Sequence, residues 1–152
     1  MEYPSRKRNR LENYDYSTNG AYFITLCTQG KVPILWRGNI PELTEAGCIS
    51  LQWLKQLPEK FPGVLLDTYA IMPDHIHFIL FFQNSSHELS QVMKWYKTMT
   101  TNALIRNVKD GHSPAFSGHL WQRSYYDHVI RNDIDLAETR RYISENPLKK
   151  QL

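Results

Sequence analysis

Cysteine is scarce in this sequence of 152 residues, which contains only Cys27 and Cys48. The two lie far apart and form neither a CxxC pair nor the spacing of a zinc site. The sequence therefore predicts neither a disulfide framework nor a thiolate metal site. We expect both cysteines to be small core residues of a protein that is kept reduced.

Long apolar runs are also absent. No stretch approaches the roughly 20 apolar residues that a membrane-spanning helix needs. The N-terminal segment carries basic residues but no apolar core of the kind that follows them in a secretory signal. These absences predict no membrane partner and a cytoplasmic location.

Net charge is small too, at +3, which alone does not indicate a nucleic-acid partner. The basic residues are nevertheless grouped, and each group could contact phosphates. The first group forms a basic arm within residues 1–12. A solvated tail or helix face is the alternative interpretation of each group. The candidate DNA-binding residues are Arg6, Lys7, Arg8, Arg10, Lys94, Lys97, Arg140, Arg141 and Lys149.

Hydrophobic periodicity predicts the order strand, helix, strand, strand, helix, strand, helix. Within it, Thr44 is expected to cap the first helix, Pro58 to break it and Pro147 to end the last helix. This order indicates an α+β fold with an antiparallel sheet and packed helices, in one domain spanning residues 1–152. The expected strands are 21–29, 64–71, 75–82 and 120–130, and the expected helices are 43–61, 89–108 and 133–145.

Two histidines lie two residues apart in the expected strand 75–82. Alternate residues of a strand point to the same face, so we expect His75 and His77 side by side, with Ile76 in the core. The run is apolar on both faces, which is typical of a central strand. Two neutral imidazoles can hold a divalent cation, and with oxygen ligands they suit Mn²⁺ or Mg²⁺. The alternative is a pair of ordinary histidines near a strand end.

A tyrosine and an asparagine lie four residues apart near the end of the last expected helix. Residues at this spacing share a helix face, so Tyr142 and Asn146 are expected to project together. A phenol can act as a nucleophile, and an amide oxygen can ligate a hard cation. The alternative is an exposed tyrosine at the end of an amphipathic helix.

Tyr126 and His128 share a face of the expected strand 120–130. Their simplest role is to support His75 and His77, the candidate metal ligands, without binding the metal themselves. Other aromatic side chains could stack on unpaired bases, although most aromatics in a chain of this size belong to the core. The aromatic candidates for DNA contact are Trp36, Trp95, Tyr96, Trp121, Tyr125 and Tyr126.

Three blocks occur in order along the chain. They are Pro73-Asp-His-Ile-His77, then Trp121-Gln-Arg-Ser-Tyr-Tyr-Asp-His-Val-Ile-Arg131, then Tyr142-Ile-x-x-Asn-Pro-Leu-Lys149. Their order and spacing resemble the single-tyrosine transposases of the HUH nuclease superfamily, in particular the REP-associated tyrosine transposase branch. The resemblance covers nearly the whole chain, and the three blocks together are far more specific than any one of them.

The resemblance implies that His75 and His77 are metal ligands, that Tyr142 is the nucleophile, and that Asn146 is a third ligand where other branches place Gln or an acidic residue. It implies a ferredoxin-like or palm-like sheet with the histidine pair on a central strand. The implied intermediate is a 5′-phosphotyrosine, and the implied substrate is single-stranded DNA that folds into a hairpin. Related transposases can form a homodimer in which the tyrosine helix of one protomer serves the partner's histidines.

The residues leave three functions open. The favoured one is a metal-dependent single-stranded DNA endonuclease and transesterase, which is a transposase that cleaves and rejoins DNA. The second is a nucleic-acid-binding protein of the same fold without turnover. The third is a metal phosphodiesterase that uses water as its nucleophile.

Overall fold

A computed structural model describes residues 19–116 and 118–151, the last four of them as backbone only. The predicted basic arm, with Arg6, Lys7, Arg8 and Arg10, lies outside the described residues, as does the side chain of Lys149.

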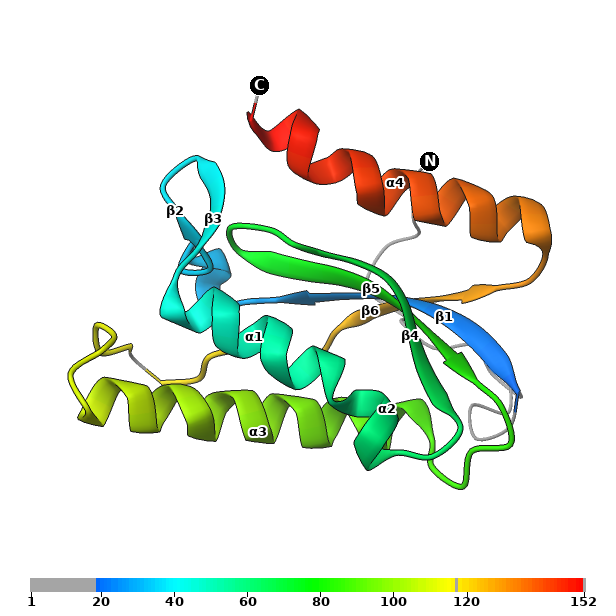
Figure 1. The fold of residues 1–152 in the computed structure, drawn as a ribbon, viewed down its shortest axis with the longest axis horizontal. Coiled ribbons are helices and arrows are strands. Elements are labelled where there is room, and N and C mark those ends of the chain that lie inside the picture. The colour runs from blue at the N-terminus through cyan, green and yellow to red at the C-terminus, as the bar shows by residue number, and fades with distance from the viewer. Residues whose placement is uncertain (1–18, 117, 152) are drawn as a thin grey trace.

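A four-stranded antiparallel sheet forms the centre of the fold (Figure 1). Its strands are β1 (Gly20–Cys27), β4 (Val64–Ile71), β5 (His75–Phe82) and β6 (Tyr126–Ile130). They lie in the order β4-β5-β1-β6, so β5 is a central strand. With a helical connection after β1 and another after β5, this is the βαββαβ arrangement of a ferredoxin-like sheet. The predicted α+β class and the central position of the histidine strand are confirmed.

Helices cover both faces of this sheet. On one face lie α1 (Glu45–Lys55) and α3 (Leu89–Lys109), with the short α2 (Leu57–Lys60) after α1, and on the other face lies α4 (Asp133–Gln151) (Figure 1). The sequence did not predict a small hairpin of β2 (Trp36–Arg37) and β3 (Ile40–Leu43), which follows the short 3-10 helix η1 (Gln29–Lys31).

Two apolar clusters form the core, one on each face of the sheet. The larger lies under α1 and α3 and contains the inward side chains of β1 and β5. The smaller lies under α4 and includes Phe23, Ile79 and Ile143, the last of which anchors α4 with no exposed surface. Four of the aromatic candidates for DNA contact, Trp36, Tyr96, Trp121 and Tyr126, are buried, as expected for most of them.

The structure corrects the predicted bounds of two elements. The first helix begins after Thr44, as predicted, and the Thr44 hydroxyl accepts a hydrogen bond from the Gly47 amide at 3.1 Å. That helix ends at Lys55 because the Gln56 amide turns back to the carbonyls of Trp53 and Leu54. The predicted strand 120–130 is regular only from Tyr126. Before Tyr126, the Lys97 ammonium donates hydrogen bonds to the carbonyls of residues 122 and 123. In a regular strand, these carbonyls would accept hydrogen bonds from a neighbouring strand.

Two further expectations are wrong. Helix α4 does not end before Pro147 but continues through it to Gln151. Proline lacks only one amide donor, and only four residues of α4 follow Pro147, so little further helix depends on the missing hydrogen bond. Cys48 is exposed and Cys27 is only half-buried, so neither is a fully enclosed core residue. Among the helices described, none is both long and apolar enough to cross a membrane.

Candidate active site

The two histidines lie at the start of β5, on the face that α4 covers. Strand register pairs His77 with Thr25 of β1, and His75 with Cys27. Ile76 points to the other face and is fully buried, as the alternation of a strand requires. His77 is buried at 4% exposure, whereas His75 is half-buried.

Each histidine is oriented by a hydrogen bond at Nδ1. The His75 Nδ1 lies 2.6 Å from Asp74 Oδ1, and the His77 Nδ1 lies 2.9 Å from Thr25 Oγ1. When both Nδ1 atoms carry the proton and donate it to these oxygens, both Nε2 lone pairs remain for a ligand. The two Nε2 atoms converge to 3.1 Å from each other.

The environment keeps His77 neutral. Burial, and after it the neighbouring His75, lowers the pKa of His77 to about 3. A neutral imidazole is the form that coordinates a metal ion. His77 is therefore held in the protonation state that a cation requires.

Tyr142 lies on α4 against this pair. Its ring centroid is 5.5 Å from that of His77 and 6.0 Å from that of Phe23, and it meets the Phe23 ring edge to face. Phe23 in turn stacks on His77 at 5.4 Å. These contacts place the Tyr142 ring beside His77.

An ion pair joins α4 to β4 two residues before Tyr142. Arg140 donates two hydrogen bonds to the carboxylate of Asp67, from Nε and from Nη2, each at 2.8 Å. This hydrogen bond from Arg140 is the main reason why the pKa of Asp67 is lowered. Arg140, which the sequence suggested for DNA contact, is thus engaged by the sheet.

Asn146 lies one turn beyond Tyr142 on α4 and is half-buried. Its Nδ2 donates to the backbone carbonyl of Tyr142 at 2.9 Å. This bond uses the amide nitrogen and not the oxygen that would ligate a cation. In the part of the chain that the structure describes, no three His, Cys, Asp or Glu side chains gather into a metal cluster. Asn146 as a third ligand beside the two histidines stays a prediction.

The two residues predicted to support the histidines lie on β6, beyond β1. Tyr126 is in register with Thr25 and packs its ring edge to face on Phe23 at 6.4 Å. His128 is in register with Phe23, and its Nε2 lies 2.8 Å from Asp135 Oδ2 in the first turn of α4. Support of the histidine pair by Tyr126 and His128 stays a prediction.

The predicted basic contacts differ in how far they are already engaged. Lys97 donates to the carbonyls of Gln122 at 2.8 Å and Arg123 at 2.7 Å, and burial lowers its pKa. These contacts of Lys97 hold a loop against α3. By contrast, Lys94 and Arg141 are exposed.

Sequence reasoning missed the residues that orient the site. Asp74 lies inside the histidine block, and its position next to His75 could have suggested its role. Thr25 and Asp67 carry no local signal, because they reach the site only through the register of β1 and the docking of α4.

Comparison with known proteins defines the class of this protein. The family model "Transposase IS200 like" matches residues 51–146. The chain belongs to this family, whose members are enzymes.

Particular relatives agree with this assignment. A Haemophilus influenzae protein described as a candidate REP-associated tyrosine transposase is 30% identical over 91% of this chain and 77% of its own length. An uncharacterized protein of the same organism is 29% identical, over 94% of this chain and 88% of its own length.

Two solved structures share the fold. One is a REP-associated tyrosine transposase bound to a REP hairpin, with a TM-score of 0.67 and 19% identity over 92% of this chain and 73% of that chain. The other is a candidate transposase from Deinococcus radiodurans, with a TM-score of 0.58 and 19% identity over 90% of this chain and 95% of that chain.

Proposed function

We propose that this protein cleaves and rejoins single-stranded DNA through Tyr142, and that residues 1–152 work as one catalytic domain. The observation that supports this most is the convergence of the His75 and His77 Nε2 atoms, 3.1 Å apart, on the sheet face where the Tyr142 ring contacts His77. Two imidazole nitrogens that can bind a metal ion, beside a phenol, are the groups that tyrosine-based phosphodiester cleavage needs.

The nitrogen pair fits a divalent cation. Two ligands at about 2.1 Å from an octahedral ion and at a right angle are about 3 Å apart, close to the observed 3.1 Å between the Nε2 atoms. Enzymes of this family generally use a divalent metal. His75 and His77 would hold Mn²⁺ or Mg²⁺, with Asn146 Oδ1 as the third ligand. Such an ion acts as a Lewis acid toward the non-bridging oxygens of a phosphate.

Tyr142 would carry the covalent step. Its Oη attacks the phosphorus in line with the 3′ oxygen, so that the Oη–P bond forms as the P–O3′ bond breaks. The phenol loses its proton to solvent, and the leaving 3′ oxygen gains one. The product is a 5′-phosphotyrosine and a free 3′-hydroxyl. Attack of a 3′-hydroxyl on this linkage reverses the step and rejoins a strand without an external energy source.

The substrate we propose is single-stranded DNA, including strands that fold into a hairpin. The solved relative bound to a REP hairpin supports this class of ligand by analogy. The exposed Lys94 and Arg141 offer charge for its phosphates, as would the basic arm within residues 1–12.

The test is covalent capture on a denaturing gel. The protein is incubated with Mn²⁺ and a pool of randomised single strands, flanked or not by a hairpin and labelled at either end. A 5′-phosphotyrosine keeps the 3′ label on the protein and releases the 5′ label. Cleavage without an adduct would instead indicate water as the nucleophile. Binding without cleavage would indicate a protein that has lost turnover.

A further inference from the structure

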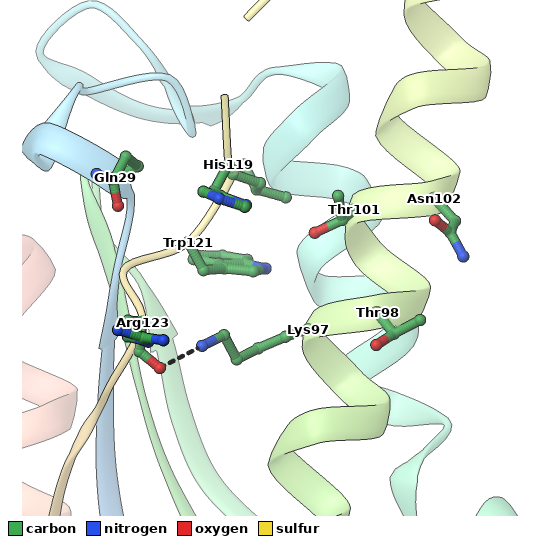
Figure 2. Close-up of a pocket in the computed structure, with 9 residues that line it drawn as sticks. Gln29, Lys97, Thr98, Thr101, Asn102, His119, Trp121 and Arg123 are labelled. Atoms are coloured by element: carbon green, nitrogen blue, oxygen red, sulfur yellow. Dashed lines mark hydrogen bonds between the residues drawn. The ribbon is translucent and has the colours of Figure 1, made fainter. Parts of the chain in front are cut away.

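A cavity of about 630 Å³ lies away from the candidate active site, between α3 and the segment that leads to β6 (Figure 2). From the segment, His119, Trp121 and Arg123 line one wall. From α3, Thr98 and Thr101 line the opposite wall. This volume is in the range of cavities that enclose small ligands, about 300 to 1,000 Å³.

The wall formed by the segment is fixed in place. The Trp121 indole is buried, and its Nε1 donates to Thr100 Oγ1 at 2.8 Å. The Lys97 ammonium holds the carbonyls of Gln122 and Arg123, and Figure 2 shows it reaching across from α3 to Arg123. The cavity is therefore preformed, with the planar groups of His119 and Arg123 exposed along its wall.

A second cavity of about 330 Å³ adjoins the first. The two share Lys97, Thr98 and Arg123, and the second adds Lys94 and Tyr125. None of the described residues that line either cavity is acidic. The pair of cavities thus joins aromatic and hydroxyl groups to positive charge.

The cavity lies at the end of the sheet where the histidines lie. The Thr28 amide donates to the carbonyl of Asp74 at 2.9 Å, and the next residue, Gln29, donates to the carbonyl of Leu120 at 2.9 Å. Gln29 also lines the cavity. Two consecutive residues that follow β1 therefore connect the turn before His75 to the cavity wall, so that one DNA strand could reach both.

We propose that this cavity holds an unpaired nucleotide of the bound DNA strand. The base lies between the exposed His119 ring and the α3 threonines, and the adjoining phosphates lie toward Lys94 and Arg123. Bases stack on aromatic rings and on guanidinium groups, and cations along the groove bind the backbone. The inference rests on the proposed function and adds a nucleotide site distinct from the scissile phosphate.

The test separates bases from phosphates. Tyr142→Phe protein, which cannot form the adduct, is titrated without metal against (dA)12, (dC)12 and (dT)12, and against a 12-mer of abasic sites with the same charge. Loss of one stacked base weakens binding by roughly 5- to 100-fold, so at least one homopolymer should bind that much more tightly than the abasic strand. Thr101→Trp, which fills the cavity, should bring this ratio close to one and leave affinity for the abasic strand unchanged.

Two further substitutions guard against misfolding and nonspecific effects. His119→Ala changes an exposed side chain and should also lower the ratio. Arg123→Ala should weaken binding to all four strands, whereas Arg106→Ala removes the same charge from α3 outside both cavities and should change nothing.

If both Thr101→Trp and His119→Ala kept the full ratio of homopolymer to abasic-strand affinity, the proposal would be overturned. Equal binding of all strands, with adduct formation by the unsubstituted protein, would overturn the nucleotide site alone. If the protein neither binds the strands nor forms an adduct, both the nucleotide site and the proposed function are overturned.

Discussion

The two faces of the central sheet are built from the same strands but differ in what they carry. Under α1 and α3, β5 contributes Ile76, Phe78 and Leu80, all fully buried in the larger apolar cluster. Under α4, the same strand contributes His75 and His77. Because successive strand residues point to opposite faces, one strand can supply both a core and a reactive site.

The difference extends to the helices. Helix α3 is held by a row of buried side chains, whereas α4 is anchored mainly by Ile143 with partly buried Leu136 and by the Arg140–Asp67 pair. The candidate nucleophile thus belongs to the less tightly held layer. Substitutions under α4 should mainly change the chemistry, and substitutions under α3 should mainly change stability.

The largest effect expected is from Tyr142→Phe. The variant should form no adduct and cleave no strand, because it lacks the attacking oxygen, while the free energy of unfolding changes by less than about 1 kcal/mol. Gel assays and urea unfolding measure the two quantities. Tyr126→Phe is the matched control on the same face and should keep much of the activity. The opposite pattern would make Tyr126 the nucleophile.

The next effect concerns the cation. His77→Ala should abolish cleavage and Mn²⁺ binding in a calorimetric titration, and His75→Ala should do the same. Asn146→Ala should be milder, since water can replace an amide oxygen ligand. If a variant lacking both histidines bound Mn²⁺ as well as the unsubstituted protein, the cation site would lie elsewhere.

The opposite face supplies the contrasting case. Leu104→Ala, at a buried position of α3, should lower the free energy of unfolding by about 2 to 5 kcal/mol. Cleavage per folded molecule should be unchanged at temperatures where the variant is folded. Urea titration and adduct yield at low temperature test this. A large loss of cleavage in fully folded Leu104→Ala would contradict the separation of the two faces.

The sequence predicted the elements in which local pattern and tertiary environment agree. The strands 64–71 and 75–82 have the bounds of β4 and β5, because apolar runs enclose the Pro73-Asp74 turn. The hairpin of β2 and β3 escaped prediction because its residues are mostly exposed and show no alternation. Pro147 misled the prediction because a proline in a last turn removes few helical bonds.

The site was predictable only in part for a related reason. The histidine pair follows from strand alternation, which is local. The contact of Tyr142 with His77 depends on how α4 docks on the sheet. The hydrogen bond between Thr25 and His77 depends on the register between β1 and β5. Such long-range partners leave no local pattern in a single sequence.

Thr25 offers a smaller and more specific test of the α4 face. Thr25→Val removes the oxygen that contacts His77 Nδ1 while keeping a similar shape. Loss of such a partner behind a metal ligand typically costs about 10- to 100-fold in metal affinity. Mn²⁺ titration and cleavage rate should both fall by this order. Thr25→Ser keeps the hydroxyl and should restore most of the affinity, whereas an equal loss in Thr25→Ser would point to packing instead.

The smallest effect is expected where α4 is tied to the sheet. The Arg140 hydrogen bonds lower the pKa of Asp67 below its usual 3.8, so the pair stabilises the fold above about pH 4 and this contribution is lost as pH falls through the lowered value. Because the pair is partly exposed, Asp67→Asn should cost no more than about 1 kcal/mol at pH 7.

Urea unfolding of both proteins from pH 7 to pH 3 should therefore give stabilities that converge at the acidic end. Arg140→Lys keeps the charge but loses the two-pronged geometry, so it should lie between the two. Cleavage should fall only modestly in Asp67→Asn, since Ile143 still anchors α4 and keeps Tyr142 near His77. A stability gap that stays constant down to pH 3 would show that the Asp67 carboxylate is not what holds α4 to the sheet.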